Sequence, residues 1–262
     1  TSRPFLLELF FDLYGRRGSG KGTTLEVLKS IAGGKHAIGT LRTSSLIKPA
    51  ALFGLIGKKI AIDNDASGRI TDAGIFNSIV SNEEVEVKKL YLNETSERLG
   101  VVVWRAFNDN PTASGGGVEG LGRRMVTFPF NKTASNPDIY LKTKLFAEVE
   151  GIFQWFWKMN DNVMMQTLKN RGNIAAVVEA SIENQLENQP VLQFIFELAD
   201  SDSILDFGAT ELYLKFKAWC DETGKGKLSQ TRFGKELSKM DGLVKKFSKS
   251  GCFRYLISPK TK

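Results

Sequence analysis

The fold of this chain is indicated first by the segment Gly15-Arg16-Arg17-Gly18-Ser19-Gly20-Lys21-Gly22-Thr23. It follows the apolar run 10–14 and leads into the helix-forming residues 24–28. A strand, a glycine-rich turn and a helix start, in that order, are the context that a phosphate-binding P-loop requires, which favours a nucleotide site over a plain flexible turn. The glycines allow backbone N–H groups to point at a phosphate, the helix N-terminus adds partial positive charge, and Lys21 would reach the β- and γ-phosphates. The predicted nucleotide-binding residues are Gly15, Gly18, Ser19, Gly20, Lys21, Gly22 and Thr23.

One position of this loop departs from the usual form. Gly22 stands where a Ser or Thr normally holds the magnesium ion, and Thr23 carries the nearest hydroxyl. Lys-Gly-Thr also occurs in nucleoside monophosphate kinases, so the loop alone does not separate a motor from a small kinase.

Length and composition are those of a soluble globular protein with one or two domains. The 262 residues are 42% hydrophobic and 25% charged, and no run of about 18 apolar residues predicts a membrane span. Cys220 and Cys252 suit a reducing compartment, so we expect a cytoplasmic protein, and no Cys/His spacing predicts a zinc site. The chain starts at Thr1, without a signal peptide or a start Met and close to the first strand, which leads us to expect a fragment of a longer protein.

The positive charge gathers near the C-terminus. Residues 201–262 hold 13 basic and 7 acidic residues, a net charge of +6, whereas the whole chain carries +7. A basic module of this kind binds a polyanion such as nucleic acid, or it simply presents a solvated lysine surface, and charge alone does not separate the two.

Three segments follow one another along the chain. In residues 1–135, strands alternate with helices, which predicts an α/β P-loop core with a parallel sheet and flanking helices, and the alternating segment 84–92 predicts a β-hairpin arm. Residues 136–200 read as helical. Apolar residues between 145 and 156 fall at spacings that line one helix face, and for Trp155 and Trp157 in that stretch we expect core or interface packing. Residues 201–262 read as a helix over 210–222, a second helix over 229–240 capped by Ser229, and a hairpin over 244–257. That order predicts a small basic winged-helix DNA-binding domain.

ATP hydrolysis needs a phosphate cradle, an acid for magnesium and water, a γ-phosphate sensor and a cation for the transition state. Candidates for the last three follow the P-loop in the expected chain order. Asp63 and Asp65 end a short apolar strand and, with Thr23, are the candidate magnesium ligands. Asn108 ends a second buried strand and is the candidate sensor. Arg123 and Arg124 follow the glycine-rich segment 113–122 and could act on the nucleotide of a neighbouring subunit.

Together these segments resemble the superfamily 3 helicases, specifically the helicase half of phage and plasmid primase-helicases of the poxvirus type. The resemblance covers nearly the whole chain: the loop at 10–23, the Gly-Lys-basic run and acidic strand at 55–65, the basic hairpin at 87–91, the sensor segment at 106–111, the arginine segment at 122–130, and the terminal module at 212–237. The family commonly has Glu where Asp65 stands.

The resemblance implies an AAA+-like motor that uses ATP and Mg²⁺, assembles as a homo-hexameric ring and unwinds DNA during replication. It also implies contacts of Lys88, Lys89, Lys245 and Lys246 with single-stranded or duplex DNA, and a primase domain ahead of Thr1. Two alternatives stay open at this point. One is a catalytically weak, DNA-binding replication initiator, motivated by Gly22 and the basic C-terminus, and the other is a nucleotide kinase.

Overall fold

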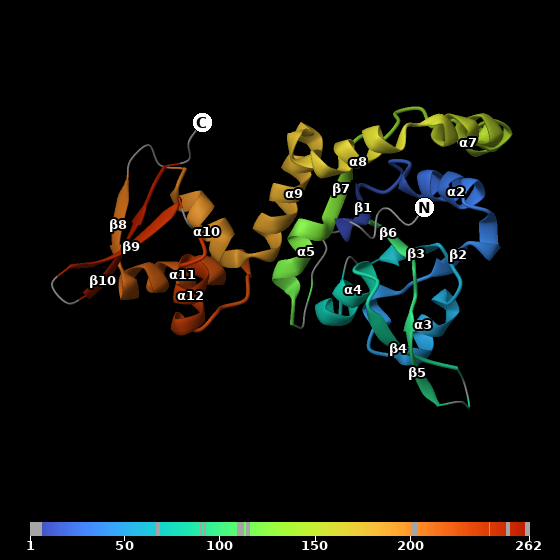
Figure 1. The fold of residues 1–262 in the computed structure, drawn as a ribbon. Helices are drawn as coiled ribbons and strands as arrows, with labels where there is room; N and C mark the ends of the chain where they lie inside the picture. The colour runs from blue at the N-terminus through green and yellow to red at the C-terminus, as the bar shows by residue number, and fades with distance from the viewer. Residues whose placement is uncertain are drawn as a thin grey trace. The chain divides into compact units, whose positions relative to one another are not determined.

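A computed structural model describes residues 7–66, 69–89, 91, 93–108, 113, 116–200, 204–240, 242–249 and 252–259. The chain divides into two compact units, Thr1–Asn184 and Gln185–Lys262 (Figure 1). Among the described helices, none combines the length and hydropathy needed to cross a bilayer.

The first unit is built on a five-stranded parallel sheet. Its order is β2 (Ile38–Thr40), β3 (Ile60–Ala66), β6 (Val102–Phe107), β1 (Phe10–Gly15) and β7 (Met125–Phe130). The apolar runs that form β1 and β6 are buried on both faces, as is typical of parallel strands covered by helices. The predicted α/β fold class is confirmed. The carboxyl ends of β1, β6 and β3 lie at one edge of the sheet, which is where ligands bind in open α/β sheets.

Helices cover both faces of this sheet (Figure 1). On one face, Leu25 of α2 (Lys21–Ile31) packs with Leu13 of β1, while Val177 of α9 (Ala175–Asn188) packs with Phe11. The other face carries the larger core, to which α3 (Pro49–Leu52) and α4 (Ala73–Val80) contribute. The Asp72 side chain caps α4 by accepting a hydrogen bond from the backbone N–H of Ile75 at 2.9 Å.

The predicted hairpin arm is present as a two-stranded sheet. It consists of β4 (Glu84–Lys88) and β5 (Glu94–Arg98), so its second strand lies beyond the segment that predicted it. Val85 and Val87 are buried while Glu84, Glu86 and Lys88 are exposed, which is the alternation that the sequence showed.

Local boundaries differ from the sequence expectations at two places. Because Gly20 adopts a left-handed conformation as the cap, α2 begins at Lys21, so the last three residues of the predicted loop are helical. The end of the expected glycine-rich loop is a short helix, α5 (Val118–Arg124), so Arg123 and Arg124 lie in a helical last turn.

The aromatic stripe after residue 140 is not core. It is divided between α6 (Leu141–Ala147) and α7 (Val149–Lys158), and α8 (Asp161–Lys169) follows. Trp155 and Trp157 are 61% and 78% exposed, so neither packs in the core of this chain, and interface packing stays a prediction. The helical period is correct: Val149 and Ile152 are half-buried, whereas α7 contributes no fully buried residue.

The second unit combines three helices with a three-stranded antiparallel sheet. In chain order it holds α10 (Pro190–Leu198), β8 (Leu205–Gly208), α11 (Ala209–Thr223), α12 (Gln230–Leu237), β9 (Val244–Lys249) and β10 (Cys252–Ile257). The predicted succession of helix, helix and hairpin is confirmed, as is the cap at Ser229, which accepts a hydrogen bond from the N–H of Arg232.

The core of the second unit begins upstream of residue 201, where the terminal domain was predicted to start. Phe194 of α10 contacts the rings of Phe216 and Phe233, at centroid distances of 5.5 and 6.4 Å. These aromatic contacts assign α10 to the terminal unit, whereas the sequence analysis grouped residues 136–200 as a separate helical segment.

Candidate nucleotide-binding site

Lys21 lies inside the glycine-rich loop. Its Nζ donates to the carbonyl oxygens of Gly15 and Arg16 at 2.7 and 2.8 Å and to Ser19 Oγ at 3.3 Å, and the side chain is buried. The loop passes so close to β7 that a Cβ on Gly15 would stand 2.2 Å from the Phe130 carbonyl oxygen, so only glycine fits there. Gly18 and Gly20 have φ of 76° and 98°, which other residues rarely adopt.

The electrostatics of this loop suit an anion. Burial lowers the pKa of Lys21, because its ammonium is removed from water and its acceptors are uncharged oxygens. The first turn of α2 carries no acidic side chain, and a Cβ on Gly18, Gly20 or Gly22 would meet no atom within 4 Å. A phosphate placed here would receive the backbone N–H groups, the helix dipole and the Lys21 charge together, so the residues fit the phosphates of a nucleotide.

Asp63 of β3 is buried and firmly held. Its Oδ2 accepts hydrogen bonds from the Thr43 backbone N–H at 2.8 Å and from the Thr43 hydroxyl at 2.6 Å. Asp65 belongs to the same strand, and its side chain lies outside the described residues. Asn108 follows β6 directly and is exposed. Because β6 lies between β1 and β3, the sheet brings Asn108 and the acidic strand to the edge that carries the P-loop.

A magnesium ion would depend on the nucleotide as much as on the chain. Among the described residues, no three His, Cys, Asp or Glu side chains cluster to form a metal cage. Magnesium is usually held by one or two carboxylates together with substrate phosphates, and Asp63 with the half-buried Thr23 is compatible with that donor set.

Sequence reasoning missed a buried ion pair beside this edge. Arg105 of β6 donates from Nε to Asp12 Oδ1 at 2.8 Å and from Nη2 to Asp12 Oδ2, and neither residue is exposed to solvent. The sequence did hold a signal, because each charge interrupts an apolar strand. By contrast, Thr43 belongs to no sequence motif that could have identified it as the partner of Asp63.

The two arginines that we expect to act on the nucleotide of a neighbouring subunit lie in different environments. Arg124 is 12% exposed and binds within its own chain, to Glu8, Asn77 Oδ1 and Ser81 Oγ. Arg123 is 71% exposed, and its closest carboxylate oxygen, on Glu8, is 3.9 Å away. Of the pair, Arg123 therefore has the freedom to reach another molecule.

The four predicted DNA-contacting lysines lie on the two hairpins, one in each unit. Lys88 ends β4 and pairs with Glu94 across the hairpin at 3.2 Å, and Lys89 lies over the Phe53 ring. Lys245 and Lys246 are exposed on β9, and Lys246 Nζ is 4.1 Å from the centroid of Phe253.

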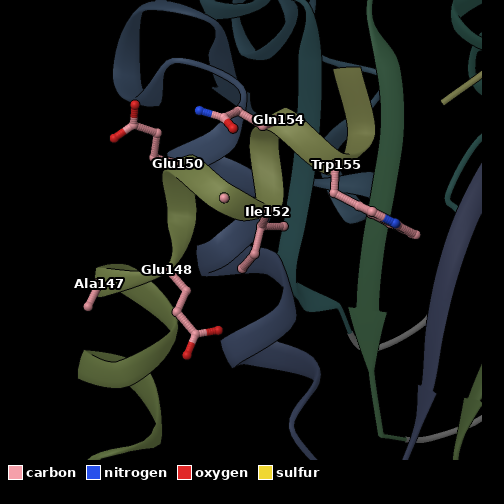
Figure 2. Close-up of a pocket in the computed structure, with 7 residues that line it drawn as sticks. Ala147, Glu148, Glu150, Ile152, Gln154 and Trp155 are labelled. Atoms are coloured by element: carbon pink, nitrogen blue, oxygen red, sulfur yellow. The ribbon is translucent and has the colours of Figure 1, made fainter. Parts of the chain in front are cut away.

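A separate hollow of about 610 Å³ lies beside α6 and α7. Figure 2 shows Glu148 and Glu150 on one side of it and the Trp155 ring extending away from them. It includes none of the predicted site residues.

Comparison with known proteins finds a family match in the terminal unit and fold matches over most of the chain. Residues 186–254, most of the second unit, match the family described as Poxvirus D5 protein-like, whereas none of the curated protein sequences matches the chain. An apo structure of the NrS-1 C-terminal region is 13% identical over 97% of this chain and 67% of its own, with a TM-score of 0.52. Another, spanning residues 305–718 of NrS-1, is 12% identical over 96% of this chain and 67% of its own, with a TM-score of 0.51. A JCV helicase is 15% identical over 88% of this chain and 56% of its own, with a TM-score of 0.34.

The family match confirms a resemblance of the terminal unit to Poxvirus D5 protein-like sequences. The NrS-1 structures confirm the fold. This chain spans about two thirds of their length. The similarity to the JCV helicase is too remote to carry an argument.

Proposed function

We propose that this chain is the ATP-driven motor of a replication helicase of superfamily 3, the helicase part of a primase-helicase. The observation that carries the proposal is the placement of Lys21, buried in a glycine-rich loop at the sheet edge shared with Asp63 and Asn108. The D5-like match of the second unit adds support for a role in DNA replication.

Each residue of this edge has a part in the proposed hydrolysis. Lys21 and the loop N–H groups bind the β- and γ-phosphates of ATP, and Asp63 and Asp65 hold the magnesium ion and orient water. Asn108 then positions the attacking water or the γ-phosphate. Arg123 stabilises the transition state in a neighbouring subunit, so hydrolysis requires an assembly, and the family resemblance makes a hexameric ring the expected one.

The proposed DNA contacts are electrostatic. Lys88 and Lys89 on the hairpin of the first unit would follow the phosphates of single-stranded DNA, and Lys245 and Lys246 on the second hairpin would contact single-stranded or duplex DNA. Phosphate contacts of this kind are largely independent of base sequence and weaken steeply with salt. Replacing Lys88 and Lys89 with Ala should therefore reduce both DNA affinity and its salt dependence. The matched control is Lys35→Ala, since Lys35 lies in η1 (Gly34–His36), outside both hairpins.

The decisive experiment is ATP hydrolysis with and without single-stranded DNA, across a range of protein concentrations. Turnover that increases with DNA, and faster than linearly with protein, supports a motor with arginines acting between subunits. Lys21→Ala should abolish hydrolysis, whereas Lys29→Ala, which removes a partly exposed lysine of the same helix, should not. Full activity of Lys21→Ala would contradict the P-loop assignment.

A second candidate function is a DNA-binding replication initiator with a weak motor. It is favoured by Gly22, which lacks the magnesium-binding hydroxyl, and by the two hydrogen bonds that Asp63 Oδ2 already accepts from Thr43. DNA binding without ATP hydrolysis by the assembled protein would support it, and robust hydrolysis would exclude it.

A further inference from the structure

A row of buried charge crosses the three central strands of the sheet. The register pairs Arg105 of β6 with Asp12 of β1 on one side and with Asp63 of β3 on the other. Residues paired in register across neighbouring strands share one face of a sheet, so all three belong to the same face. Asp12 and Arg105 are 0% exposed and Asp63 is 4% exposed.

The Arg105 guanidinium is held rigidly in this row. Two of its nitrogens bind Asp12, and its Cζ lies 5.2 to 5.4 Å from the ring centroids of Phe10, Phe76 and Phe107. The third nitrogen, Nη1, is buried and has no hydrogen-bond partner in the described part of the chain. An unused N–H on a buried charge is costly, which indicates a partner in another state of the site.

The row holds two carboxylates and one guanidinium, and of the two carboxylates only that of Asp12 binds the guanidinium. Burial raises the pKa of Asp12, Arg105 opposes that rise, and the charge of Asp63 adds to it. Asp63 is therefore close enough to act electrostatically on the Asp12–Arg105 pair. Thr43 supplies neutral donors to Asp63 but no positive charge.

We propose that Arg105 is a positioning residue for ATP hydrolysis, whose free Nη1 holds the Asp63 carboxylate when Asp63 turns from Thr43 toward magnesium and the nucleotide. The inference rests on the proposed function, since it assigns to Asp63 the magnesium role given above. It connects the P-loop strand, the sensor strand and the acidic strand through one side chain. The competing interpretation is purely structural: Arg105 neutralises Asp12 and has no effect on Asp63.

A double variant separates the two interpretations. Asp12→Asn with Arg105→Met removes both charges of the pair together, so no buried charge from that pair is left unmatched. Arg105→Lys is the second variant, because it keeps the positive charge for Asp12 but loses the separate Nη1 donor. Thermal unfolding reports folding, a fluorescent ATP analogue titrated with and without Mg²⁺ reports binding, and steady-state hydrolysis with single-stranded DNA reports kcat.

We expect both variants to fold and to bind the analogue without Mg²⁺ within about twofold of the parent chain. The gain in affinity on adding Mg²⁺, and kcat, should each fall about tenfold, the size of effect that outer-shell partners of metal ligands typically have. A double variant with the kcat and magnesium dependence of the parent would overturn the proposal, as would Arg105→Lys with unchanged values. If the parent binds the analogue but does not hydrolyse ATP, the proposed motor function fails, and the magnesium dependence of binding still decides the role of Arg105.

Discussion

Restoring the hydroxyl that the P-loop lacks should strengthen magnesium use. Gly22→Ser places a hydroxyl directly after Lys21, in the first turn of α2. The structure has room for it, because a Cβ at Gly22 meets no atom within 4 Å, the residue is exposed, and its backbone lies outside the left-handed region. The substitution therefore adds a potential metal ligand without strain.

Two effects of this change have different sizes. In a helix interior, the helix propensity of glycine is about 1 kcal/mol less favourable than that of alanine, and that of serine about half as much. Gly22→Ser should therefore raise the free energy of unfolding by at most about 0.5 kcal/mol, and Gly22→Ala by at most about 1 kcal/mol. The hydroxyl effect should be larger, since changes in and around a metal's ligand shell alter affinity by about 10- to 100-fold. We expect Gly22→Ser to lower the Mg²⁺ concentration for half-maximal hydrolysis about tenfold.

Gly22→Ala is the matched control, because it adds the same Cβ and more helix propensity but no hydroxyl. The assay is ATP hydrolysis titrated with Mg²⁺ at fixed protein and single-stranded DNA, alongside thermal unfolding. Equal magnesium dependence of the Ser and Ala variants would refute the reasoning. If Gly22→Ser does not differ from the parent while Thr23→Val loses activity, then Thr23 already supplies the hydroxyl.

Three further predictions concern the first unit. Arg124→Ala should destabilise this unit by about 2 kcal/mol, because it removes a largely buried guanidinium and its hydrogen bonds to a carboxylate and two neutral side chains. Arg123→Ala should leave the melting temperature unchanged and reduce turnover about 10³-fold. Equal melting temperatures for the two variants would contradict this. The hydrogen bond from Arg124 lowers the pKa of Glu8. The contact therefore stabilises the folded chain fully above the ordinary pKa of 4.5, and this stabilisation is lost as the pH falls through the lowered pKa. Glu8→Gln should weaken the pH dependence of unfolding in that acid range, and an unchanged profile would count against the contact. Asp72→Ala should lower the free energy of unfolding in urea by about 1 kcal/mol, because it removes the cap of α4. Asp72→Asn keeps an acceptor and should lower it less. Equal losses for the two variants would contradict a contribution from the cap hydrogen bond.

The P-loop shows how far local sequence carries a prediction. Strand, glycine turn and helix are all set by neighbours along the chain, so residues 10–31 could be read before any tertiary contact was known. The first strand of the hairpin, Glu84–Lys88, and the cap at Ser229 are of the same kind, because alternation and capping act over a few residues.

The contacts of the site residues could not be read in this way. Asp63 pairs with Thr43, 20 positions away, and Arg105 pairs with Asp12, 93 positions away, because strand order and register place them side by side. The separation of Arg124 from Arg123 also depends on Glu8, which is 116 positions from Arg124 and reaches it only through the fold.

Local sequence is therefore sufficient to predict the phosphate loop, the order of strands and helices along the chain, and the basic character of the terminal unit. Which charges are buried, which arginine is exposed, and the exposure of Trp155 and Trp157 depend on the tertiary structure. The physical reason is range. Propensity, periodicity and turn chemistry act between near neighbours in the chain, whereas burial and ion pairing depend on which distant strands and helices come to lie beside one another.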